Sequence, residues 1–148
     1  MASSFVYVRV RAWIEVPLMN WINKYLSATY EDGARGPDKY DCWGLCREVR
    51  HEQCGKRLLP SFGSVRNTQP KEFTLAYQAE AKNMQECEPE SGAIAAVFRG
   101  ALCIHVAVII EVGNELHALE INPKKGARLM RIPDFESQYL RVAYYRDN

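Results

Sequence analysis

The hydrophobic pattern of the sequence changes near Gly92, and this change constrains the fold more than any other feature. Before Gly92, apolar residues recur every three or four positions, which is typical of amphipathic helices. After it, short runs rich in β-branched residues are separated by turn-forming residues, which is typical of strands. Helices followed by consecutive strands indicate an α+β domain in which N-terminal helices pack on a C-terminal antiparallel sheet.

The expected elements can be placed by their periodicity and their end signals. Helices are expected from Pro17 to about Thr29, from the N-cap Asp41 to Gly55, and over 71–83. Strands are expected over 94–98, 104–111, 115–121, 128–132 and 139–145, joined as a meander. A further strand over Phe5–Arg11 lies in an N-terminal extension, residues 1–16, which we expect to be a docking segment. The loop 60–70 is a second candidate for a docking or occluding surface.

Length and composition narrow the class of protein. The 148 residues fit a single domain, 1–148. Nineteen Lys and Arg against eighteen Asp and Glu give a net charge of +1, so nucleic acid and membrane surfaces are not expected partners. No apolar run is long enough to span a bilayer, and charged residues interrupt the start of the chain where a signal peptide needs an apolar run. We therefore expect synthesis in the cytoplasm, where the five cysteines stay reduced.

Cys42 is the candidate nucleophile. It lies in the first turn of the helix that Asp41 is expected to cap, where unpaired backbone N–H groups favour a thiolate. A nucleophilic thiolate needs a base within hydrogen-bonding reach. His51 lies about two and a half turns along the same helix and is too distant. The base would have to be His105 or His117.

His105 and His117 lie on two strands that a Gly113-Asn114 turn joins. If that turn is the tip of a hairpin, residues whose numbers sum to about 227 face each other. His117 then faces Ile110 and not His105. Spacing alone therefore leaves open whether the two histidines meet.

The motif around Cys42 resembles a known family. Residues 30–45 read YEDGARGPDKYDCWGL, which is similar to the nucleophile motif of NlpC/P60 cysteine peptidases, where a Tyr precedes an Asp-Cys element through a Gly-rich loop. The segment HVAV at 105–108, followed by a Gly-Asn turn and LHA at 116–118, is similar to the second block of the family. The resemblance covers residues 30–118 and implies a papain-like fold that requires no metal or other cofactor.

The resemblance also implies a role for each matched residue. Cys42 attacks the substrate carbonyl, His105 takes and returns the proton, and His117 orients the imidazole. Tyr30 helps to hold the oxyanion, Asp41 contacts the free amine of a stem peptide, and Trp43 lines the peptide subsite. The expected reaction is hydrolysis of an amide in peptidoglycan, typically between γ-linked D-glutamate and the diamino acid, through a thioacyl intermediate.

The Asp-Cys-Trp-Gly-Leu form, followed by Arg47, is most similar to the NlpC/P60 proteins of phage tail-assembly clusters. This resemblance implies tail tip or hub proteins as partners and incorporation into the virion tail. Two positions depart from the family pattern: Trp43 replaces a small Ser, and Ala93 replaces the Asp of a Gly-Asp-Leu strand start.

Two other interpretations stay open. A tail component could keep the fold and serve as a structural plug or assembly factor with weak or no activity. Alternatively, Cys42, Cys46, His51 and Cys54 form a C-x3-C-x4-H-x2-C series that resembles a zinc site. Structural zinc usually takes a ligand pair from a tight turn, whereas this series lies along one expected helix whose faces diverge.

Overall fold

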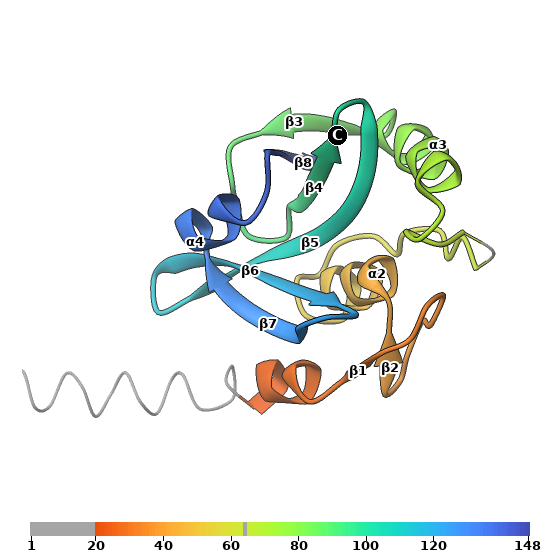
Figure 1. Cartoon of the computed structure of the whole chain (residues 1–148). Helices are drawn as coiled ribbons and strands as arrows, with labels where there is room; N and C mark the ends of the chain where they lie inside the picture. Colours follow the sequence, from red (N-terminus) through yellow and green to blue (C-terminus); the bar gives the residue numbers. More distant parts are fainter. Residues whose placement is uncertain (1–19, 64) are drawn as a thin grey trace, which may run out of the picture.

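A computed structural model describes residues 20–63 and 65–148. It contains helices packed against a six-stranded antiparallel sheet (Figure 1), so the prediction of an α+β architecture is confirmed. The expected strand over Phe5–Arg11 and the start of the first expected helix lie outside the described residues.

The helices of the N-terminal half lie where the sequence predicts them. Residues 20–26 are helical, α2 spans Cys42–Glu52 and α3 spans Pro70–Ala81. Asp41 is the N-cap of α2, as predicted, because its carboxylate accepts a hydrogen bond of 2.8 Å from the backbone N–H of Gly44. Two short strands precede α2 and pair in parallel, β1 (Thr29–Tyr30) and β2 (Lys39–Tyr40).

The large sheet has the strand order β3-β8-β4-β5-β6-β7. Its strands are β3 (Met84–Cys87), β4 (Ile94–Arg99), β5 (Leu102–Val112), β6 (Glu115–Asn122), β7 (Gly126–Arg131) and β8 (Arg141–Asp147). The β5–β6 hairpin has the predicted register: Val112 pairs with Glu115 and Ile110 pairs with His117.

The meander prediction is wrong for the last strand. β4 to β7 follow one another across the sheet, but β8 crosses back and lies between β3 and β4. The short helix α4 (Ile132–Ser137), with a proline in its first turn, redirects the chain between β7 and β8, where the sequence suggested only a turn. β3 was not expected because its four residues follow α3 after only two residues and have no clear period.

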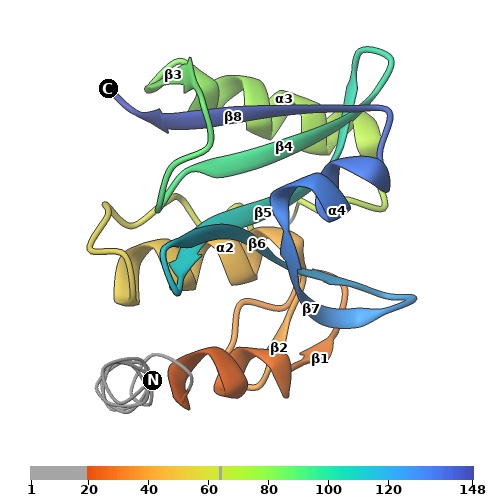
Figure 2. The ribbon, with the colours of Figure 1, turned by 90° about the vertical axis from the view of Figure 1, so that its left-hand side faces the viewer.

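Helices cover both faces of the sheet (Figure 2). On one face, residues of α2 and α3 pack with Val106, Val108 and Leu119 in the larger core cluster. On the other face, Phe135 of α4 packs with Ala107 and Ile109 in the smaller cluster. Because successive side chains of a strand point to opposite faces, neighbouring residues of β5 belong to different cores.

Ion pairs tie the end of β8 to the helical layer. The fully buried Arg50 of α2 lies 2.9 Å from Asp147, measured from Nη2 to Oδ2. Arg57 contacts the same carboxylate at 3.2 Å and also pairs with Glu80 of α3. The end of β8 is therefore joined directly to α2 and, through Arg57, to α3.

No helix among the residues that the structure describes is long and apolar enough to cross a membrane.

Gly44 provides a test of the packing at the start of α2. A Cβ atom there would overlap the carbonyl oxygen of Ala34 and lie 3.1 Å from the Cα atom of Arg35. Gly44→Ala should therefore lower the free energy of unfolding by about 1–3 kcal/mol, although alanine has a better helix propensity than glycine. Urea unfolding would measure the change, with Gly63→Ala as control because its Cβ would meet only the Ser61 side chain at 3.7 Å. Equal stability of the two variants would contradict the close approach.

Candidate active site

Cys42 lies at the start of α2 and faces the large sheet. It is only 1% exposed and packs in the same core cluster as Val106 of β5. Its thiol is close enough to the backbone of Val106 for a hydrogen-bonding interaction. The thiol therefore lies beside the residue that directly follows His105.

The protonated thiol is the favoured form of Cys42 in this conformation. Burial raises its pKa well above the ordinary value, and the negative charge of Asp41 raises it further. The contact with the Val106 backbone lowers the pKa but does not offset these two effects. The predicted stabilisation of a thiolate by the helix start is thus outweighed by the loss of solvent.

Tyr30 lies near Cys42 and packs against the same core cluster. Burial raises the pKa of the Tyr30 phenol, and electrostatic interaction with Cys42 is the next largest cause. The phenol donates a hydrogen bond of 3.0 Å to the side-chain oxygen of Asn67. Tyr30 is therefore positioned beside the thiol by the loop that precedes α3.

The Asp41 carboxylate is occupied by groups of the protein itself. Besides capping α2, it accepts hydrogen bonds from the backbone N–H of Gly33 at 3.1 Å and from Nη1 of Arg35 at 2.7 Å. Arg35 also donates to the carbonyl oxygens of Ser61 and Phe62, which joins two loops at this point. Contact between Asp41 and a substrate amine would have to compete with these bonds.

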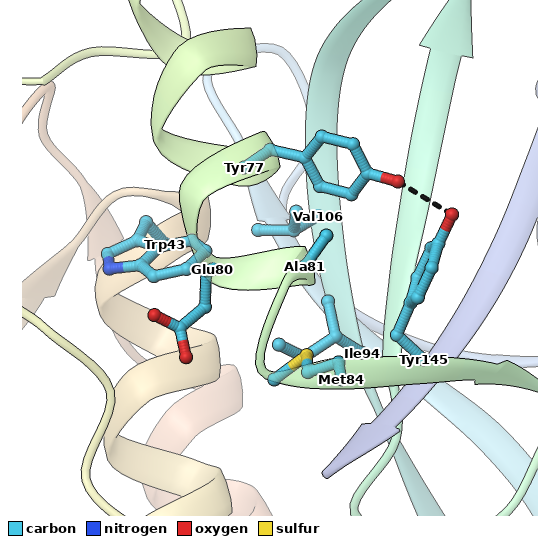
Figure 3. Close-up of a pocket in the computed structure, with 8 residues that line it drawn as sticks. All are labelled: Trp43, Tyr77, Glu80, Ala81, Met84, Ile94, Val106 and Tyr145. Carbon is cyan, nitrogen blue, oxygen red and sulfur yellow. Dashed lines mark hydrogen bonds between the residues drawn. The ribbon is translucent and has the colours of Figure 1, made fainter. Parts of the chain in front are cut away.

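Trp43 lies in the core and not on an open peptide-binding surface. Its indole N–H donates a hydrogen bond of 2.8 Å to the carbonyl oxygen of Pro60. Figure 3 shows Trp43 at one side of a small cavity between the helices and the sheet, opposite the hydrogen-bonded pair Tyr77 and Tyr145. The cavity has a volume of about 10 Å³, enough for about one water molecule.

The side chain of His105 lies on the other face of the sheet from Cys42. His105 pairs with Val97, which belongs to the core cluster on the α4 side. Its ring lies 5.8 Å from that of Tyr139, which packs against the same cluster. Cys42 packs with Val106 on the α2 side. The structure therefore does not bring the predicted nucleophile and base together.

A β-bulge determines the face on which His105 lies. Phe98 pairs with Cys103 and Val97 pairs with His105, so Ile104 is an extra residue in β5. Without the bulge, strict alternation from Cys103 through Ile104 would place His105 on the α2 side. Ile104 and His105 instead both lie on the α4 side.

Glu120 holds the His105 ring on the α4 side. Nε2 of His105 donates a hydrogen bond of 2.9 Å to Oε1 of Glu120. The same oxygen accepts from the Tyr139 hydroxyl at 2.8 Å, and Oε2 accepts from Nε of Arg128 at 2.9 Å. Burial alone would raise the pKa of Glu120, but His105, Tyr139 and Arg128 together lower it to about 2. Both oxygens of the buried Glu120 carboxylate thus accept hydrogen bonds, and one of the donors is the His105 imidazole.

His117 does not contact His105 in this network. It shares the α2 face of β6 with Leu119 and Ile121, and its Nδ1 lies 3.0 Å from the carbonyl oxygen of Glu115. The residue that orients His105 in this conformation is Glu120. The catalytic roles of Cys42, His105 and His117 stay predictions.

Sequence reasoning missed Glu120, although a signal was present. An isolated acidic residue between Leu119 and Ile121, in an otherwise apolar run, requires a donor or a cation if it is buried. The Asn-Pro-Lys-Lys-Gly turn places residues whose numbers sum to 248 opposite each other, so Arg128 faces Glu120. This cross-strand pair could have been predicted from the sequence.

The zinc-like series does not gather into a site. Cys42 and Cys46 are buried, whereas His51 is exposed and contacts the carbonyl oxygen of Lys56. Within 20–63 and 65–148, no group of three or more His, Cys, Asp or Glu side chains is placed to hold a metal ion.

Comparison with models of known protein families and with curated proteins gave no match to this chain. The similarity to NlpC/P60 peptidases therefore rests on the motif residues alone.

The pKa of Glu120 gives a pH-dependent prediction. Its carboxyl should contribute stability above the ordinary value of 4.5, and this contribution should be lost as the pH falls towards about 2. The difference in unfolding free energy between wild type and Glu120→Gln should therefore be larger at pH 6 than at pH 3, by roughly 2 kcal/mol. Urea unfolding at both pH values would measure it. The control is Glu115→Gln, an exposed residue of the same strand, and equal differences for both variants would contradict the pairing.

Proposed function

We propose that this chain is a peptidoglycan hydrolase of the NlpC/P60 type, and that the conformation described here is an inactive, resting one. The substrate would be a stem peptide, cut at an amide such as the γ-D-glutamyl bond to the diamino acid. The protein would act as part of a phage tail, in contact with tail tip or hub proteins.

The observation that carries this proposal is the meeting of three distant segments at one thiol. Tyr30, the start of α2 and the β5 backbone at Val106 all lie at Cys42. These are the segments in which the motif residues occur. His105 directly precedes Val106 on β5, so the candidate base lies one residue from the backbone that the thiol contacts.

In the resting conformation no step of hydrolysis takes place. Activity would require the His105 ring to reach the α2 side of β5 and the thiol to become accessible. The ring would then take the proton from the Cys42 sulfur, the thiolate would attack the carbonyl carbon, and the amine would leave with the proton that His105 returns. Water would release the acyl group and regenerate the thiol.

A second candidate function is a structural plug or assembly factor of a phage tail without activity. It is favoured by the sealed thiol and by the internal hydrogen bonds of Asp41, Trp43 and His105. Each of these residues would then have a structural role only, in packing the core, capping a helix or pairing a buried charge. The two candidates differ in whether wild-type protein ever cleaves a wall peptide.

Alkylation tests the resting conformation. Cys54 and Cys87 are half-buried, whereas Cys42, Cys46 and Cys103 are buried. Iodoacetamide near pH 7.5 should therefore alkylate Cys54 and Cys87 of the native protein first, and Cys42 should be alkylated at least tenfold more slowly. Peptide mass mapping over time would give the five rates, with unfolded protein in urea as the reference. Cys42 reacting first would contradict the sealed thiol.

Digestion of purified peptidoglycan tests the function. Wild-type protein should release stem-peptide fragments slowly, because the resting conformation dominates. Cys42→Ala and His105→Ala should both abolish release, whereas Cys46→Ala, a matched change one turn further along α2, should retain it. Mass spectrometry of the fragments identifies the bond. Absence of release by wild type at every protein concentration would favour the structural plug.

A further inference from the structure

A displacement of the β5 bulge by one residue would move one side chain to the other face of the sheet. At present Ile104 and His105 together lie opposite Val97. If the bulge moved by one residue, Ile104 would pair with Val97, and His105 and Val106 would together lie opposite Ala96. His105 would then join Val106 on the α2 face, while Ile104 would stay on the α4 face.

The rest of the sheet tolerates this shift. The pairs from Ile94↔Val108 to Ala96↔Val106 on one side of the bulge, and Phe98↔Cys103 on the other, already have the faces that the new register needs. The described pairing of β5 with β6 begins only at Val108↔Leu119, so the hairpin to β6 is not broken. The shift would therefore break none of the described β5–β6 pairs and would replace only the Val97↔His105 pair with β4.

The two registers differ in what the His105 ring contacts. In the resting register it is bonded to Glu120. After the shift, Glu120 would keep its donors Tyr139 and Arg128, so its charge would not be left unpaired. The ring would enter the layer that holds Cys42 and Val106. The cavity beside Val106 has only about 10 Å³, so neighbouring side chains must move, which favours the resting register.

We propose that movement of the β5 bulge by one residue is the conformational switch that brings His105 to Cys42. Glu120 is the positioning residue that keeps His105 on the α4 face in the resting conformation. This inference rests on the proposed hydrolase function. The resting and active conformations would then differ in the face of the sheet on which the His105 side chain lies.

Disulfide trapping tests the switch without measuring hydrolysis. His105→Cys, in a background with Cys46→Ala and Cys103→Ala, should form a disulfide with Cys42 under mild oxidation, because only the shifted register turns the Cβ atom of residue 105 towards the face on which Cys42 lies. Ile104→Cys is the matched negative control, since this residue stays on the α4 face in both registers. Val106→Cys is the positive control, since it faces Cys42 in both. Circular dichroism would verify that each variant is folded.

The outcomes separate this inference from the proposed function. A disulfide for His105→Cys and Val106→Cys, but not for Ile104→Cys, is expected. Trapping at Val106→Cys alone would overturn the switch, even if the wild type digests peptidoglycan. Trapping at Ile104→Cys as well would also overturn it, because general opening of the sheet would then explain the result.

The role of Glu120 is tested on otherwise native protein. NMR relaxation dispersion of the labelled His105 ring would report exchange with a minor state. Glu120→Gln keeps the shape but removes the charge from the hydrogen bond, which should raise the minor population about tenfold. Glu115→Gln should leave it unchanged. An unchanged minor population in Glu120→Gln, or no exchange in either protein, would overturn the assignment.

Discussion

Alternation of side chains across a strand that is buried on both faces controls the whole site. β5 lies inside the sheet, with α2 and α3 on one face and α4 on the other, so each of its residues belongs to one of two separate cores. A single extra residue in such a strand decides which core receives the next side chain. The face on which His105 lies therefore determines whether its side chain can meet that of Cys42. The separation of the two residues in sequence does not.

Much of the architecture could be predicted because local signals were strong. Asp41 marks the start of α2, Pro70 lies at the start of α3, and the Gly113-Asn114 turn gives the β5–β6 register. The position of β8 was not predictable from local pattern, since pairing with β4 depends on packing between distant segments. The bulge at Ile104 has no glycine or other sequence signal, so the face of His105 could not be predicted.

Cys42 illustrates a conflict between two effects of position. A helix start favours the charged form of a thiol, whereas removal from water favours the neutral form. Sequence reveals the first effect through the Asp41 cap, but burial depends on loops that Arg35, Trp43 and Tyr30 hold in place through hydrogen bonds to residues 60–67. Those long-range bonds reverse the expected ionisation.

The position of β8 also bears on how the chain reaches its folded state. β8 follows every other strand in sequence but lies between β3 and β4, and its last residue joins Arg50 and Arg57. Until it inserts, β4 has an open edge with unpaired backbone groups and β3 has no neighbour. A nascent chain that still lacks β8 would thus expose the unpaired edge of an apolar strand, which is prone to aggregation. The sheet would be completed only after β8 has been synthesised.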